Sequence, residues 1–67
     1  MTDSVALRNA IDNHGLRFGY VAARLGLSRG GLWKKLKNDS EFKASEIATL
    51  SELLGLSATE VRDIFLS

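Results

Sequence analysis

The chain has 67 residues, and its composition excludes several classes of protein before any motif is considered. It contains no cysteine and one histidine, so neither a disulfide scaffold nor a thiolate or imidazole metal site is expected. Hydrophobic residues make up 45%, as in a folded globular domain, and no apolar run is long enough to span a bilayer. The length predicts one domain over residues 1–67 and leaves no room for a catalytic domain of ordinary size.

The net charge of +1 hides an uneven distribution of charge along the chain. Residues 17–43 contain seven basic and two acidic side chains, whereas both flanking segments carry a net negative charge. This basic block predicts a cationic face suited to a polyanion. Chance clustering of surface lysines is the alternative explanation, and charge alone does not separate the two.

The first two predicted helices lie at about residues 4–14 and 18–25. Asp3 or Ser4 can cap the first helix, and Gly15 suits the left-handed position just past its end. In the second helix, apolar residues recur at spacings i, i+3, i+4 and i+7, which is typical of a stripe that faces a core. The residues of this stripe are Phe18, Val21, Ala22 and Leu25.

Three further helices are predicted, at about residues 29–37, 44–54 and 58–65. Ser28 is a good N-cap for the first of these, and residues 57–60 have the pattern of a capping box for the last. Residues 38–41 form a polar turn, after which Phe42 anchors the chain to the core. Because no strand signal is present, the sequence predicts a compact all-α domain of five helices.

The connection between the second and third predicted helices is the most informative segment. It consists of residues 25–28, in which Gly26 permits a positive φ and Ser28 at once begins a new helix. A turn this short forces the two helices to cross steeply. The sequence therefore predicts a helix-turn-helix over about residues 18–37.

Two ordered sets of residues carry a family resemblance. The first set is Gly15-Leu16, Val21-Ala22, Leu25-Gly26-Leu27-Ser28-Arg29, Leu32 and Leu36. The second set is Ser40-Glu41-Phe42, Ser45-Glu46-Ile47 and Leu53-Leu54-Gly55-Leu56-Ser57. Together they resemble phage Cro and repressor proteins, the XRE-type regulators, over about residues 4–65. The resemblance implies a lambda-repressor-like DNA-binding domain in the cytoplasm of a bacterial host cell.

In that family the second helix lies across the DNA backbone and the third enters the major groove. By position, the resemblance implies that the residues reading bases are Ser28, Arg29, Gly30, Gly31 and Lys34. Arg29 can donate two hydrogen bonds to guanine O6 and N7, and Lys34 can reach a base edge or a phosphate. Solvated surface charge is the alternative role for both side chains.

Contacts to the DNA backbone are expected from a second set of residues: Arg17, Trp33, Lys35, Lys37, Asn38 and Lys43. For each of the polar residues, ordinary solubility is an equally good explanation. Trp33 lies beside the apolar stripe, so packing along the sugar-phosphate backbone and partial burial in the protein are both open. Arg24 is a weaker candidate, because a basic residue near a helix C-terminus is favourable in itself.

Some positions depart from the family pattern. Arg17 stands where serine or threonine usually caps the second helix, and Phe18 where a glutamine often binds phosphate. We expect Phe18 to be a core residue, because it belongs to the apolar stripe.

The pair Gly30-Gly31 weakens the first turn of the third helix and removes two base-reading side chains. Two explanations of Gly30-Gly31 remain open. The glycines let the backbone approach DNA closely, or the protein tolerates a weak start to this helix.

The expected function is that of a small, Cro-like transcriptional regulator that binds a double-stranded operator and needs no cofactor, metal or small-molecule substrate. One recognition helix reads only a few base pairs, so we expect a weak homodimer on a palindromic operator. Phe65 and Leu66 are its predicted interface, with an inward-facing Phe65 as the alternative. The rival function is a protein-interaction module on the same helices, such as an antirepressor or antitoxin. Paired carboxylates and a phosphate-binding glycine loop are missing, so no enzyme is indicated.

Overall fold

The computed structural model describes residues 1–66, and these residues form five α-helices and no strand. The helices are α1 (Ser4–Asn13), α2 (Phe18–Arg24), α3 (Arg29–Leu36), α4 (Ala44–Leu54) and α5 (Ala58–Phe65). The predicted all-α fold of five helices is confirmed. None of the helices in this part of the chain is long and apolar enough to cross a membrane.

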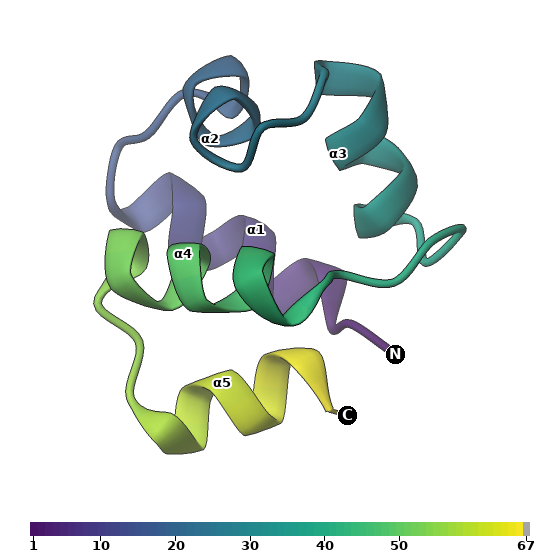
Figure 1. Ribbon diagram of the computed structural model, residues 1–67. Helices are drawn as coiled ribbons and strands as arrows, with labels where there is room; N and C mark the ends of the chain where they lie inside the picture. Colours follow the sequence, from purple (N-terminus) through teal and green to yellow (C-terminus); the bar gives the residue numbers. More distant parts are fainter. Residues whose placement is uncertain (67) are drawn as a thin grey trace.

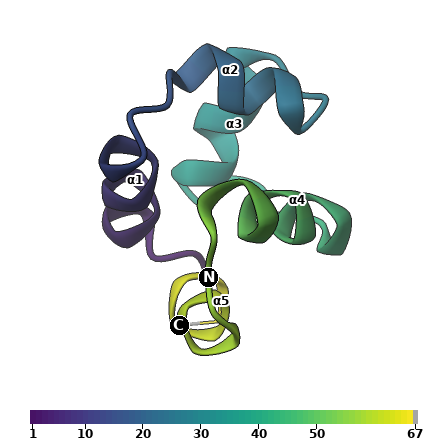
Figure 2. The same cartoon turned by 90° about the vertical axis from the view of Figure 1, so that its left-hand side faces the viewer.

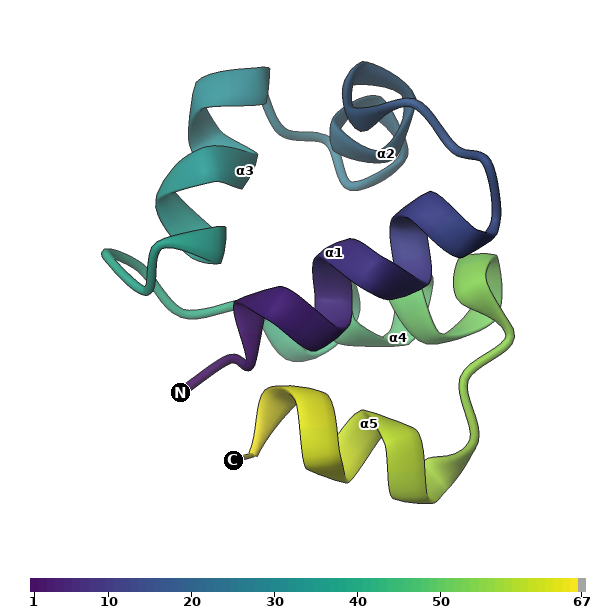
Figure 3. The ribbon, with the colours of Figure 1, turned by 180° about the vertical axis from the view of Figure 1, so that it is seen from behind.

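The helices surround one interior. α2 and α3 cover one end of the molecule, and α5 crosses the opposite end (Figure 1). Between these ends, α1 and α4 lie on opposite sides, which is clearest in the view turned by 90° (Figure 2). The start of the chain lies near the end of α5 (Figure 3), where the N–H of Asp3 donates a 2.6 Å hydrogen bond to the carbonyl of Ile64.

Every helix contributes two buried apolar residues to the core, and the segment before α4 contributes one more. These residues are Leu7, Ile11, Val21, Ala22, Leu32, Leu36, Phe42, Leu50, Leu54, Ile64 and Phe65. The ring of Phe42 meets the ring of Phe65 edge-on, with 5.5 Å between their centroids. The prediction that Phe42 anchors its segment to the core is therefore confirmed.

The position of Phe65 corrects the predicted dimer interface. Its side chain is 4% exposed, because it turns inward onto Phe42 and leaves no surface for a second chain. The neighbouring Leu66 is 74% exposed. Of the two residues predicted for the interface, only Leu66 is accessible.

Hydrogen bonds from local side chains set the start of α1 and α5, as the sequence predicts. Asp3, rather than Ser4, caps α1: its carboxylate accepts the N–H of Ala6 at 3.1 Å. At the start of α5, the Ser57 hydroxyl accepts the N–H of Glu60 at 3.1 Å. The carboxylate of Glu60 in turn accepts the N–H of Ser57 at 2.9 Å, which completes the capping box.

Candidate nucleic-acid interface

Four residues, 25–28, join α2 to α3 at one end of the molecule. Gly26 has a φ of +71°, in the left-handed region where a side chain is strained. The N–H of Leu27 donates to the carbonyl of Ala22 at 2.9 Å, which closes α2. The chain then turns sharply: Figure 1 shows α2 nearly end-on, whereas α3 lies along the plane of the view.

The first turn of α3 lies at the end of the molecule opposite α5 (Figures 1 and 3). The hydroxyl of Ser28 accepts the N–H of Gly31 at 3.0 Å, so the predicted N-cap is confirmed. Ser28, Arg29 and Gly30 are all exposed. The hydroxyl of Ser28 is bonded to the backbone of α3, whereas Arg29 and Gly30 face solvent.

The structure separates the roles of the two adjacent glycines. A Cβ atom on Gly31 would lie 3.2 Å from the Ser28 hydroxyl oxygen, closer than ordinary contact. Gly31 therefore leaves room for the cap of α3. A Cβ atom on Gly30 would meet nothing within 4 Å, so nothing inside this part of the chain requires a glycine there.

The side chain of Arg29 reaches back over α2. A Cβ atom on Gly19 would lie 3.9 Å from both Cδ and Nη1 of Arg29, so the guanidinium lies beside the N-terminal half of α2. Within residues 1–66, Arg29 forms neither an ion pair nor a hydrogen bond through its guanidinium. Its N–H groups are therefore available to an external acceptor.

Four other basic candidates also remain accessible. Arg17, Lys34 and Lys43 are exposed, and none of them pairs with a carboxylate in the described part of the chain. The ammonium of Lys37 lies 3.8 Å from the carboxylate of Asp39, and both side chains are exposed. An exposed pair of this kind is weak and leaves Lys37 free to exchange partners.

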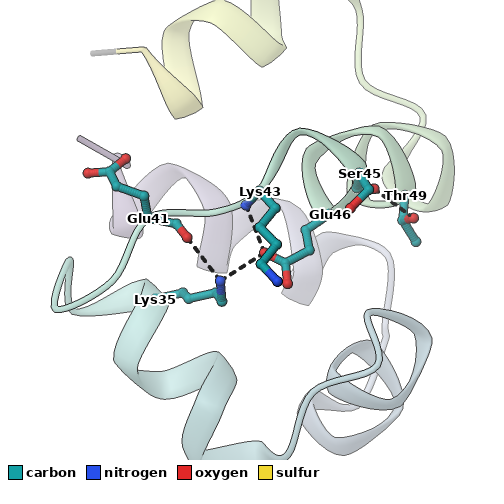
Figure 4. A network of polar contacts seen from close by, with 6 residues as sticks. All are labelled: Lys35, Glu41, Lys43, Ser45, Glu46 and Thr49. Carbon is teal, nitrogen blue, oxygen red and sulfur yellow. Dashed lines mark hydrogen bonds and ion pairs between the residues drawn. The ribbon is translucent and has the colours of Figure 1, made fainter.

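Lys35 corrects the set of predicted phosphate contacts. Its side chain is 9% exposed, and its ammonium lies between α3 and α4, 2.9 Å from the carboxylate of Glu46 (Figure 4). It also donates a 2.9 Å hydrogen bond to the carbonyl of Glu41. A buried ammonium held by two protein oxygens cannot reach a DNA phosphate. The sequence signal was its position three residues after the core residue Leu32, on the inner side of α3.

Glu46 links the start of α4 to α3. Its Oε1 atom accepts the N–H of Lys43 at 2.8 Å and faces the ammonium of Lys35 (Figure 4). Burial raises the pKa of the Glu46 carboxyl. The hydrogen bond from the N–H of Lys43 and the hydrogen-bonded, positively charged ammonium of Lys35 lower this pKa by a larger amount. The pKa of Glu46 therefore lies below its ordinary value, and the carboxylate stays ionised beside Lys35.

Asn38 is a second correction, because its amide is engaged inside the protein. The side-chain oxygen accepts the N–H of Thr2 at 2.8 Å, and the side-chain nitrogen donates to the carbonyl of Thr2 at 3.1 Å. Asn38 has a φ of +63° and ends α3, a conformation that asparagine tolerates better than most residues. The hydroxyl of Ser4 also donates to the carbonyl of Leu36. Asn38 thus fastens the N-terminal segment to the end of α3 and is not placed to contact phosphate.

Trp33 is partly covered and partly accessible, with 42% of the residue exposed. Its ring packs on Phe18, with 4.8 Å between centroids, and the guanidinium carbon of Arg8 lies 4.9 Å from the ring centroid. Phe18 also packs against the core, as predicted. Together with Val5, Trp33 and Arg8 line an open groove between α1 and α3.

Arg24, which the sequence offered as a weaker candidate, has an exposed partner on α2 that was not predicted, Tyr20. Nη1 of Arg24 donates a 3.1 Å hydrogen bond to the hydroxyl of Tyr20, one helical turn earlier. Tyr20 is 46% exposed, and Arg24 is also exposed. The i, i+4 spacing of a tyrosine and an arginine on the polar side of a helix was the available signal.

The exposed charges divide the molecule into a basic and an acidic end. Arg17, Arg24, Arg29 and Lys34 lie on or beside α2 and α3, whereas α5, at the other end, carries Glu60 and Asp63 against Arg62. In the part of the chain that the structure describes, residues 1–66, this protein is a small, compact molecule of five helices. Comparisons with protein-family models, curated proteins and solved structures find no match for the chain.

Proposed function

We propose that this protein is a DNA-binding transcriptional regulator that resembles Cro and acts in the cytoplasm of a bacterial host. The observation that carries this proposal is a set of exposed basic side chains with no carboxylate partner in the described part of the chain: Arg17 and Arg24 at the two ends of α2, Arg29 in the first turn of α3 and Lys34 in its last turn. In helix-turn-helix proteins the first of two such helices crosses the DNA backbone and the second enters the major groove. α2 and α3, joined by residues 25–28, are the candidates for these two roles.

The proposed contacts follow from which side chains remain accessible. Arg29 and Lys34 read base edges, while exposed Gly30 lets the backbone of α3 approach DNA closely. Arg17, Lys37 and Lys43 bind phosphates, and the exposed part of Trp33 packs along the sugar-phosphate backbone. Ser28 and Gly31 contribute by beginning the reading helix, because the hydroxyl of one is bonded to the backbone N–H of the other.

The salt dependence of binding tests this proposal. Each phosphate neutralised by a basic side chain lowers the slope of log affinity against log salt by about 0.9. We expect a slope several units negative for binding to duplex DNA, measured by fluorescence anisotropy. Lys37→Ala should make the slope shallower by about one unit. Arg62→Ala on α5 is the matched control and should leave it unchanged. A flat response for the parent protein would contradict the proposal.

A homodimer that associates weakly in solution and more strongly on DNA is part of the proposed function. Two-fold pairing doubles the sequence read and requires a palindromic operator with half-sites about one helical turn apart. Leu66, which is 74% exposed beyond the end of α5, is the proposed contact. Sedimentation at rising concentration should show association that operator DNA strengthens and Leu66→Ser weakens. One monomer bound to a single half-site would contradict it.

A protein-interaction module on the same helices is the second candidate, and the groove between α1 and α3 favours it. Val5 is 72% exposed there and lies beside the accessible side of Trp33. In this role, charge changes on α2 and α3 would have little effect, whereas Val5→Ser would weaken binding to the partner. The salt experiment therefore discriminates between the two functions.

A further inference from the structure

Tyr20 and Arg24 present an unusual pair of polar groups on the outer side of α2. Val21 and Ala22 turn inward and are buried, whereas both members of the pair are exposed. The phenol is hydrogen-bonded to Arg24 and to no other described residue, and Arg24 has no carboxylate partner within residues 1–66. The guanidinium carbon lies 6.0 Å from the centre of the Tyr20 ring.

The direction of this hydrogen bond leaves donors available on both side chains. Arg24 donates to the phenolic oxygen, so the Tyr20 proton stays free for an outside acceptor. Donation from a cation also polarises the phenol and makes it a better donor. The guanidinium keeps further N–H groups of its own. Two neighbouring donors, one of them charged, match the two anionic oxygens of a phosphodiester.

The place of the pair connects it to the proposed reading of DNA. A Cβ atom on Gly19, the residue before Tyr20, would lie 3.9 Å from the side chain of Arg29, so this side chain lies beside α2. The pair lies on α2, the helix that would cross the DNA backbone and beside which the arginine that would read bases also lies. We infer that Tyr20 and Arg24 together bind one phosphate of duplex DNA. This inference rests on the proposed function and adds to it a phosphate-binding pair on α2.

The test measures the affinity of five proteins, namely the parent, three single variants and one double variant, for a short duplex of random sequence across a range of salt concentrations. Tyr20→Phe removes the phenolic proton and keeps the ring, and Arg24→Gln removes the guanidinium. Arg62→Gln removes one positive charge from α5, far from α2, and is the matched charge control. Thermal unfolding of each variant checks that the fold is retained.

We expect Tyr20→Phe to weaken binding roughly three- to tenfold at every salt concentration, because one hydrogen bond is lost, with the slope unchanged, because its donor carries no charge. Arg24→Gln should make the slope shallower by about 0.9, whereas Arg62→Gln should not. In the Arg24→Gln background, Tyr20→Phe should have a smaller effect, because the phenol is no longer oriented by the guanidinium.

Two results would overturn the inference while leaving the proposed function intact. One is unchanged affinity of Tyr20→Phe beside a salt-dependent parent. The other is an Arg24→Gln variant whose slope matches that of Arg62→Gln. A parent protein whose affinity does not depend on salt would overturn the proposed function and the inference together.

Discussion

Replacing Lys35 by alanine should destabilise the protein by about 1–3 kcal/mol, because it removes the charged donor bonded to the carboxylate of Glu46 and leaves that carboxylate only the N–H of Lys43. A loss of this size is a large part of the stability of a small domain. Urea denaturation followed by circular dichroism measures the effect. Lys34→Ala is the matched control: it removes the same residue type from the exposed side of α3 and should change stability by less than about 0.5 kcal/mol.

Removing both charges of the pair should destabilise the protein far less than removing one of them. Lys35→Met with Glu46→Gln removes both charges and keeps a side-chain oxygen that can accept the N–H of Lys43, and replacing a buried ion pair by uncharged residues is often neutral or stabilising. We therefore expect the double variant to recover most of the stability that Lys35→Ala loses. If Lys35→Ala lowers the stability of the protein as little as Lys34→Ala does, the ammonium of Lys35 is not held in a buried pair. Lys35 then returns to the set of phosphate contacts.

The pH dependence of stability reports on the same pair. The pKa of Glu46 is lower in the folded protein than in the unfolded chain. Its contribution is therefore fully present above the pKa of the unfolded chain and is lost as the pH falls through the folded-state pKa. The double variant lacks this titrating group, so its stability should fall less steeply in the same acid range.

Arg29→Ala should cost about 1–3 kcal/mol in binding to the preferred DNA site and relax the choice at one base pair. The reason is that Arg29 has an exposed guanidinium at the start of α3 with no partner among the described residues. Binding to random duplex should change much less. Selection of preferred sequences from a random library, with the parent and the variant side by side, measures both quantities.

Lys37→Ala is the control for this experiment, because it should weaken binding to the preferred and the random duplex by similar factors. A similar uniform loss for Arg29→Ala would contradict base reading and make Arg29 a phosphate contact. The position of its side chain beside Gly19 on α2 gives this outcome a structural explanation.

The helices and their ends were determined by the sequence itself. Asp3, Ser28 and Ser57 bond to N–H groups only three residues away, and Gly26 takes its positive φ within a turn of four residues. Apolar spacing likewise depends only on the period of the helix. Interactions that close within one or two turns need no knowledge of the rest of the fold, so the bounds of these helices were predicted to within one residue.

Only the tertiary structure decided which polar residues of the basic block stay accessible. Lys34 and Lys35 are adjacent and chemically identical, yet the first is exposed and the second is paired with Glu46, eleven positions further along the chain. Asn38 bonds to Thr2, 36 residues away. Such partners meet only when helices pack, and the packing depends on the whole core. A count of charges depends only on the residue types in the sequence. Whether a charged side chain is available to a ligand depends on which residues the fold packs against that side chain.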